Sequence, residues 1–178
     1  MGKVIAVCTS DRKGLQKHDV NTAHFSAEWG IDGDAHAGSW HRQVSLLSAD
    51  KIEAFNKRGA NVIPGAFGEN LVVEGFDFRA LPVGTLLRCG DVLLEMTQIG
   101  KECHSHCEIY KKMGECIMPR EGVFARVIEP GSISVGDEMS IEKREGHFPW
   151  QAAVITLSDK AAAGERKDES GPAIAKRL

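Results

Sequence analysis

The chain has 178 residues, with 42% hydrophobic residues, 26% charged residues and a formal net charge of -3. These values are typical of a soluble globular protein and argue against a general nucleic-acid-binding or membrane-surface role. No apolar run reaches the roughly 20 residues of a membrane span, and the N-terminus does not read as a signal peptide. Five cysteines, an odd number, do not suit a closed disulfide framework, so we expect a cytoplasmic protein with reduced thiols.

The N-terminal part of the chain predicts two strands separated by a long connection. Residues 3–9, KVIAVCT, are rich in β-forming side chains and predict an opening strand. Residues 10–40 are polar, contain several glycines and have little periodicity, so we expect a long structured loop. A second strand is expected at 43–47, QVSLL.

A short helix is expected directly after this second strand. Ser48 is a suitable N-cap, the helix would continue through Arg58, and Gly59 would end it. Ile52 and Phe55 fall on one face of such a helix and are expected to face the core.

The rest of the first 143 residues predicts many short strands. Gly90-Asp91 lies between two apolar runs, which is a hairpin signal. Further strands are expected at 123–128 and on both sides of Gly136-Asp137. Few helical segments separate these strands, so the pattern favours a mainly β fold with a closed or partly closed barrel over an alternating βαβ fold.

The composition changes near residue 144, which indicates a domain boundary. We expect a first domain at 1–143, a linker at 144–150 and a different segment at 151–178. That last segment predicts a strand and then a helix, with Ser170 as its N-cap and Pro172 in the first turn. One strand and one helix cannot bury a core, so this tail must dock, pair with another chain or stay mobile.

The stretch from Gly100 to Gly122 has an unusual concentration of soft ligands. It holds three of the five cysteines (Cys103, Cys107 and Cys116) and two of the seven histidines. A structural zinc site would need four ligands, and one close pair alone is evident here. The alternatives are ordinary thiols or a reactive, metal-ligating thiol whose pKa nearby lysines and arginines would lower. Cys8 and Cys89 lie in apolar strands and are expected in the core.

Two glycine-bearing loops offer polar groups to a ligand. The first, 33–43, carries Asp34, His36 and His41, together able to bond a polar ligand, and the alternative is a solvated loop. The second, 64–71 (PGAFGENL), places the Glu69-Asn70 pair just before an apolar strand. A plain turn explains the second loop equally well.

Two arginines follow the cysteines. Arg120 and Arg126 flank a glycine turn in PREGVFAR and could hold a phosphate by bidentate hydrogen bonds. A solvated arginine pair is the alternative.

The order of these motifs resembles the MOSC domain, the family related to the C-terminal part of molybdenum cofactor sulfurase. The resemblance covers about residues 1–143 and rests on GDAHAG, RQVSLL, PGAFGENL, LPVGTLLRCGDVLLEMTQIGKEC and CIMPREGVFARVIEPGSISVGDEM. It implies a MOSC-type β-barrel and a protein that binds Mo-molybdopterin or transfers sulfur to it through a cysteine. Some members of the family are molybdenum-dependent reductases, so the resemblance also implies an enzyme, as sulfurtransferase or oxidoreductase.

The resemblance assigns roles to particular residues. Cys116 resembles the molybdenum-ligating cysteine of the reductase branch, and Cys103 resembles the cysteine of small family members; Cys116 is favoured as ligand or sulfur carrier. Residues expected to bind the molybdenum cofactor are His36, Arg42, Glu69, Asn70, Lys101, Arg120 and Arg126. Zinc is not expected as a cofactor.

The tail and the possible partners extend this interpretation. ITLSDKAAAGERKDESGPAIAKRL resembles the opening of the MogA/MoaB molybdopterin adenylyltransferase family, so we expect the natural chain to continue past Leu178. No pyridoxal-phosphate lysine motif is evident, so a pyridoxal-phosphate-dependent cysteine desulfurase would supply the sulfur, or a molybdoenzyme would be the partner. The alternatives are a non-enzymatic sulfur carrier that receives persulfide and a zinc-stabilised structural domain. No nucleic-acid or membrane partner is expected.

Overall fold

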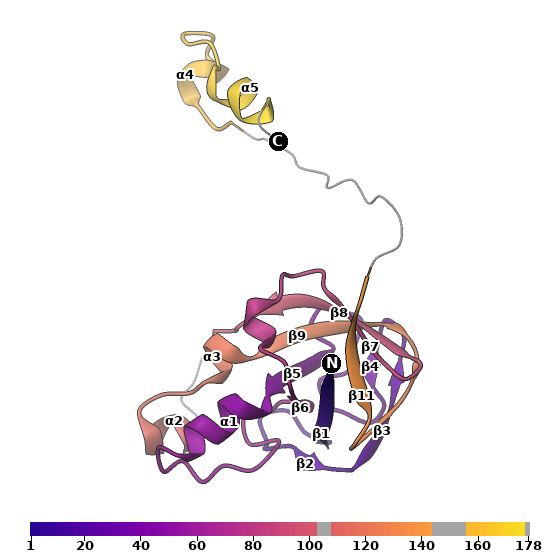
Figure 1. The fold of residues 1–178 in the computed structure, drawn as a ribbon. Helices are drawn as coiled ribbons and strands as arrows, with labels where there is room; N and C mark the ends of the chain where they lie inside the picture. The colour runs from indigo at the N-terminus through magenta and orange to yellow at the C-terminus, as the bar shows by residue number, and fades with distance from the viewer. Residues whose placement is uncertain (103–107, 144–155, 177–178) are drawn as a thin grey trace. The chain divides into compact units, whose positions relative to one another are not determined.

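The computed structural model describes residues 1–102, 108–143 and 156–176 (Figure 1). The chain divides into two compact units, Met1–Arg144 and Glu145–Leu178. The strands of the first unit are β1 (Gly2–Thr9), β2 (His18–Asp19), β3 (Thr22–Ser26), β4 (Gly30–Ile31), β5 (Val44–Ser48), β6 (Leu71–Glu74), β7 (Leu86–Cys89), β8 (Val92–Ile99), β9 (Val123–Glu129), β10 (Gly131–Ser134) and β11 (Glu138–Glu142). Its helices are α1 (Ala49–Asn56), the 3-10 turn η1 (Phe78–Ala80), α2 (Glu108–Met113) and α3 (Met118–Glu121).

Seven of these strands close into a barrel. Their order is β11–β7–β8–β9–β5–β6–β1, and β1 pairs again with β11, where Gly2 faces Met139 and Lys3 faces Glu138. Neighbouring strands are antiparallel except for β5 and β6, which are parallel. Closure leaves no exposed edge among these strands. The predicted mainly β barrel with a few short helices is therefore confirmed, including the hairpin about Gly90-Asp91.

Strand β5 lies between two hydrophobic cores. Leu46 packs inside the barrel with residues such as Phe25, whereas Leu47 packs outside it against Phe55 of α1. All five residues of the strand are buried. A strand covered on both faces has no need of polar alternation. Its buried polar residue Ser45 is hydrogen-bonded to Asn70. This double burial fixes the loop that enters β5, and that loop carries Arg42.

The prediction of a loop at 10–40 is wrong over part of that range. This segment contains β2, β3 and β4, and β3 joins β10 and β4 in a separate three-stranded sheet. The pairing that creates β3 is with residues more than a hundred positions away, for example His24 with Ser132. The local sequence therefore carried little of the information that forms the strand.

Helix α1 has the predicted buried face but not the predicted cap. Ile52 and Phe55 are buried, as expected, and the helix ends at Asn56 instead of Arg58. Ser48 occupies the N-cap position, yet its hydroxyl makes no capping bond. That hydroxyl accepts instead a hydrogen bond from the Phe78 backbone N–H at 3.4 Å. The buried contact with η1 replaces the local one.

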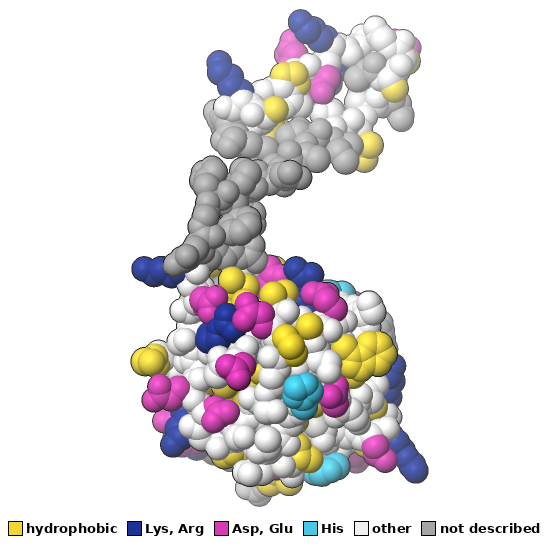
Figure 2. All heavy atoms as spheres, turned by 90° about the vertical axis from the view of Figure 1, so that its right-hand side faces the viewer, with side chains coloured by type: hydrophobic (Ala, Val, Ile, Leu, Met, Phe, Trp, Pro, Cys, Tyr) yellow, Lys and Arg dark blue, Asp and Glu magenta, His cyan; other side chains and the backbone are white. Residues whose placement is uncertain are grey.

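Charged side chains alternate in sign on the outer wall of the barrel. Figure 2 shows basic side chains lying among acidic ones on the face that it presents. Arg88 of β7 donates to Glu129 and to Glu142, both at 2.6 Å. Exposed pairs of this kind contribute little each, so they join β7, β9 and β11 without dominating stability.

The second unit contains two short helices, α4 (Asp159–Ala162) and α5 (Ser170–Ala175). The strand expected from residue 151 falls partly outside the described residues, and 156–158 carry no strand. Ser170 is the first residue of α5 and not its cap: the Asp168 carboxylate accepts the N–H groups of Ser170 and Gly171, both at 3.0 Å. The predicted linker at 144–150 lies outside the described residues. Within the described parts of both units, every helix is too short or too polar to span a bilayer.

The two ends of the cysteine-bearing segment are held together by a backbone contact. The Gly100 N–H, at the end of β8, donates to the Gly122 carbonyl at 2.7 Å. Gly100 has a φ of +71°, and a Cβ atom there would lie 2.3 Å from the Pro119 carbonyl oxygen. Only glycine fits this contact, which brings the chain just before Cys103 next to the chain just after Cys116.

Replacing Gly100 by alanine tests whether this contact shapes the fold. Gly84 is a matched control because its φ is also positive, at +90°, but nothing lies within 4 Å of an added Cβ atom. We expect Gly84→Ala to lower the free energy of unfolding by about 1 kcal/mol, the backbone strain alone. Gly100→Ala should lower it by about 3 kcal/mol or more, because the clash adds to that strain. Equal losses in urea unfolding would contradict this account of the junction.

Candidate functional site

Two cations share the ring of Phe124 at the start of β9. The Arg42 guanidinium lies 5.6 Å from the Phe124 ring centroid and 4.8 Å from that of Trp40. The Lys101 Nζ lies 6.0 Å from the Phe124 centroid. These distances fit cation–π contacts. An aromatic ring attracts a cation but carries no net charge, so the positive charge is not neutralised. Both cations are half-buried.

The positive charges of Arg42 and Lys101 are not compensated by the part of the chain that the structure describes. Neither side chain has a carboxylate within ion-pair distance among these residues. The Arg42 Nε atom is buried and has no hydrogen-bond acceptor there. A buried donor without an acceptor is costly, so this N–H lacks a hydrogen bond that the described residues do not supply.

The two other predicted arginines are engaged in surface ion pairs. Arg120 donates to Glu115 at 3.2 Å. Arg126 donates to Glu95 at 2.8 Å and lies 3.7 Å from Glu28. Their charges are thus locally balanced, unlike those of Arg42 and Lys101. That Arg120 and Arg126 bind a cofactor stays a prediction.

A hydrogen-bonded chain links the loop of Arg42 to the loop of Lys101. The His41 Nε2 atom lies 2.9 Å from the Gln98 side-chain oxygen. The Gln98 side-chain nitrogen donates to the Gly100 carbonyl at 2.6 Å. The Thr97 hydroxyl also donates to the His41 carbonyl. The predicted ligand-binding residue His41 therefore joins the two basic loops.

The cysteines fall into distinct environments. Cys8 and Cys89 are fully buried, as predicted, and burial raises the pKa of each thiol to about 12. Such thiols stay protonated at neutral pH and are poor nucleophiles. Cys116 is half-buried at the margin of the outer core, near α1 and α3. Cys103 and Cys107 lie outside the described residues.

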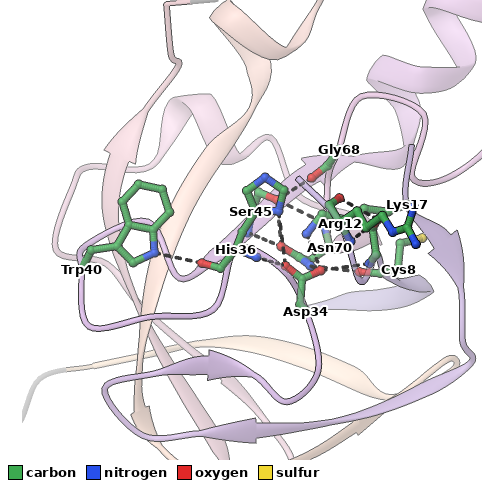
Figure 3. Close-up of polar contacts among 10 residues, drawn as sticks. Cys8, Arg12, Lys17, Asp34, His36, Trp40, Ser45, Gly68 and Asn70 are labelled. Carbon is green, nitrogen blue, oxygen red and sulfur yellow. Dashed lines mark hydrogen bonds and ion pairs between the residues drawn. The ribbon is translucent and has the colours of Figure 1, made fainter. Parts of the chain in front are cut away.

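A buried polar network surrounds Asp34 (Figure 3). The Lys17 ammonium donates to Asp34 Oδ2 at 2.7 Å, and both side chains are only 1% exposed. The Ser10 N–H and the Asn70 side-chain nitrogen also donate to Oδ2, each at 3.2 Å. The His36 N–H donates to Oδ1 at 2.9 Å. One carboxylate thus joins four separate segments of the chain.

Asp34 is ionised within this network. Burial alone would raise its pKa, but hydrogen bonding from His36 and Lys17 outweighs it and holds the pKa well below its ordinary value. Burial lowers the pKa of Lys17, and Asp34 opposes that shift. Lys17 was not singled out in the sequence, because nothing in its local context distinguishes it from an exposed lysine.

The Glu69-Asn70 pair is turned into the protein. Glu69 is fully buried, and its carboxylate accepts the N–H groups of Gly65 at 2.7 Å and Phe67 at 3.0 Å. Burial raises the pKa of Glu69. Asn70 accepts from the Ser45 N–H at 3.1 Å and donates to the Cys8 carbonyl at 2.9 Å. Both side chains hold loops in place here, and their contact with a cofactor stays a prediction.

His36 lies between the network and the two cations. Its carbonyl accepts the Trp40 indole N–H at 3.0 Å, and Trp40 in turn lies against Arg42. Among the predicted site residues, the structure places Arg42 and Lys101 on one aromatic ring, and a backbone contact through Trp40 links His36 to Arg42. No group of three metal-ligating side chains occurs within residues 1–102, 108–143 and 156–176.

Comparison with known proteins agrees with this architecture. A family model described as "MOSC domain" matches residues 33–140. A protein of Gibberella moniliformis (strain M3125 / FGSC 7600) named "Reductase" is 30% identical over 142 residues. The match covers 72% of this chain and 25% of that protein, so the chain spans about a quarter of the length of this relative.

Solved structures share the fold at low identity. The YuaD protein of Bacillus subtilis has a TM-score of 0.65 and 20% identity, with 78% of this chain and 94% of that chain covered. YiiM of Geobacillus stearothermophilus has a TM-score of 0.62 and 17% identity over 81% and 76% of the two chains. YiiM of Escherichia coli has a TM-score of 0.57 and 20% identity over 83% and 72%.

Replacing Asp34 tests whether its network is the anchor of the site. Asp34→Asn leaves the Lys17 charge buried without a counter-charge, so we expect the free energy of unfolding at pH 7 to fall by about 3–5 kcal/mol. Glu53→Gln is the matched control: the Glu53–Lys57 pair has the same 2.7 Å separation but is largely exposed, and its loss should be barely measurable. Equal losses in denaturant unfolding would contradict the assignment.

The stability difference between wild type and Asp34→Asn is expected to depend on pH. The folded-state pKa of Asp34 lies below its ordinary value of 3.8, so the ionised carboxylate stabilises the fold above that pH. This contribution is lost as the pH falls through the folded-state pKa. The stability difference between wild type and Asp34→Asn should therefore shrink on acidification below about pH 4.

Proposed function

The chain belongs to the MOSC domain family, and on this premise we propose that it binds the molybdenum cofactor, or transfers sulfur to it, through a cysteine of the segment 100–122. Proteins of this family are associated with the molybdenum cofactor in general. The proposal that this chain itself binds the cofactor or transfers sulfur to it rests on its own residues. It requires a binding site for the anionic pterin phosphate and, next to that site, a cysteine that ligates molybdenum or carries sulfur.

The observation that carries the proposal is the uncompensated charge of Arg42 and Lys101 on the Phe124 ring. The half-buried Arg42 guanidinium suits a phosphate oxygen, because guanidinium–phosphate hydrogen bonds are short and charge-assisted. Trp40 and Phe124 add flat apolar surface beside these charges. The barrel itself does not need two cations that no described carboxylate pairs, whereas an anionic planar ligand would.

Cysteines lie in the segment that starts and ends beside this basic position. Lys101 follows Gly100, whose contact with Gly122 holds the two ends of the segment together. A thiolate suits molybdenum because both are soft, and it can equally carry a sulfur atom as persulfide. When bound, the cofactor would supply two-electron redox chemistry and oxygen- or sulfur-atom transfer. Cys116 is our first candidate for the thiolate, and Cys103 is the second.

Reductase activity has less support than cofactor binding in this proposal. The relative named "Reductase" matches this chain over only 25% of its own length. Three quarters of that protein lie outside the match, so its name is not evidence for the same activity in the matched domain. What the match supports is a role of the shared domain within a redox protein.

Cysteine replacements in a host with an intact cofactor pathway test the proposal. We expect purified wild-type protein to contain molybdenum and pterin, and Cys116→Ser to lose most of the molybdenum because a hydroxyl is a poor ligand for a soft metal. Cys103→Ser would show the loss if Cys103 is the ligand. Cys107→Ser is the matched control from the same segment and should retain the cofactor. Absence of metal and pterin from wild-type protein would contradict cofactor binding.

The same proteins separate a carrier from a cofactor-binding enzyme. After incubation with a pyridoxal-phosphate-dependent cysteine desulfurase, a carrier gains one sulfur atom on a single cysteine, detected by mass spectrometry, and contains no molybdenum. Such a result would favour the non-enzymatic sulfur carrier over the cofactor-binding protein. Unfolding by a chelator would instead indicate a zinc-stabilised domain.

Arg42→Met tests the phosphate position. This change removes charge-assisted hydrogen bonds worth about 1.5–3 kcal/mol, so pterin should be retained about 10- to 100-fold less well during dialysis. Arg79→Met is the control, because it removes the same charge from an exposed residue that pairs with Glu121. Equal pterin retention by wild type and both variants would place the cofactor phosphate elsewhere.

A further inference from the structure

The orientation of the His36 ring is fixed from its buried side. The side chain is 35% exposed, yet its Nδ1 atom is buried and lies 3.4 Å from Asp34 Oδ1, within ion-pair distance but outside hydrogen-bond geometry. The backbone N–H of the same residue donates to the same oxygen at 2.9 Å. Figure 3 shows the imidazole turned with one edge toward Asp34. The exposed part of the ring is therefore the opposite edge, which carries Nε2.

The partners of Asp34 determine which nitrogen of His36 carries the proton. Oδ2 already accepts from Lys17, Ser10 and Asn70. Oδ1 accepts one backbone N–H and has a further lone pair available. An ionised carboxylate can only accept, so the Nδ1 atom that faces it must be the donor. The neutral ring then has a lone pair on Nε2, at its exposed edge.

His36 and Arg42 of the basic position lie on the same loop. The His36 carbonyl accepts the Trp40 indole N–H, and the Trp40 ring lies beneath the Arg42 guanidinium. The loop from Asp34 to Arg42 thus carries a buried carboxylate, an imidazole, an indole and a guanidinium in order. A ligand held at Arg42 would have the imidazole as its neighbour along this loop.

We propose that His36 is the proton-transfer residue of this site, with Nδ1 facing Asp34 and Nε2 at the exposed edge, available to a ligand. The placement of the ligand rests on the proposed function, whereas the orientation of the ring does not. A histidine that is oriented by a buried carboxylate through Nδ1 is the arrangement of the Ser-His-Asp triad, in which the imidazole acts as a general base. The 3.4 Å contact with Asp34 would tighten into a hydrogen bond on ligand binding, as long contacts in ligand-free sites commonly do.

The proton balance of this step is simple. Nε2 takes a proton from an N–H, O–H or S–H group of the ligand, which leaves the electron pair on the ligand atom. The ring becomes an imidazolium, stabilised by the negative charge of Asp34. Because the ring is one-third exposed, the proton then passes from Nε2 to water. In the reverse direction the same atom delivers a proton to the ligand.

Lys17 has a positioning role in this arrangement. It fixes the Asp34 carboxylate through Oδ2, so that Oδ1 keeps its direction toward His36. It also balances the buried negative charge, which otherwise would bind a proton. The charged groups next to His36 in the described residues are therefore Asp34 directly and Lys17 behind it.

The tautomer of His36 in wild-type protein is the first test. Long-range ¹H–¹⁵N NMR spectra at a pH where the ring is neutral distinguish Nδ1–H from Nε2–H. We expect His36 to be almost wholly Nδ1–H. His24 is the internal control, because its Nδ1 lies 3.4 Å from the Ser132 hydroxyl, which imposes no tautomer. A His36 that is mainly Nε2–H, or a mixture like that of His24, would overturn the proposal, and no variant has to fold for this result.

Two substitutions test the chemical role separately from the structural one. In His36→Asn the amide can replace the Nδ1–H donor to Asp34 but offers no base, whereas His36→Ala removes both functions. We expect both to lower turnover of cofactor-loaded protein by about 100-fold or more. Only His36→Ala should also lower the thermal midpoint. Wild-type turnover in His36→Asn would overturn the proton-transfer role, and wild-type protein without cofactor would refute the proposed function while leaving the tautomer result intact.

Discussion

The buried ion pair between Lys17 and Asp34 is the interaction on which the site depends. It ties the end of β1, the segment before β2, the loop that enters β5 and the start of β6 to one carboxylate. Removing one partner of such a pair costs far more than an exposed pair would, because the remaining charge stays buried. The pair therefore functions as an anchor for conformation more than as a source of net stability.

Asp34 and the residues proposed to face a ligand lie on one short loop. This arrangement explains how a barrel presents a rigid site. Asp34 is at the buried end of the loop and Arg42 at the end that enters β5, a strand buried on both faces. Between them Trp40 bonds the His36 carbonyl. Both ends are fixed by the core, so the polar groups between them keep their directions without a bound ligand. Preorganisation of this kind lowers the cost of binding.

The sequence predicted the parts of this structure that depend on local signals. Gly90-Asp91 specified a hairpin, and the apolar strands around Cys8 and Cys89 specified buried thiols. It did not predict β3, one of whose two partner strands is β10, more than a hundred residues away, nor the cap of α1, where the Ser48 hydroxyl accepts from Phe78 instead. Arginines were recognisable by type, but their tertiary neighbours were not: Arg126 of β9 pairs with Glu95 of β8, whereas Arg42 lies against two aromatic rings and has no described carboxylate beside it. Such differences arise from tertiary neighbours, which spacing along the chain does not encode.

The central claim is that an anionic cofactor is held by Arg42 and Lys101 beside the cysteine-bearing segment. The most direct measurement is a crystal structure of protein purified with its cofactor from a host that makes it. The account predicts phosphate density in contact with Arg42 and Lys101, and molybdenum within bonding distance of a thiolate from residues 100–122. A cofactor bound elsewhere on the barrel, with these two cations still facing solvent, would contradict it.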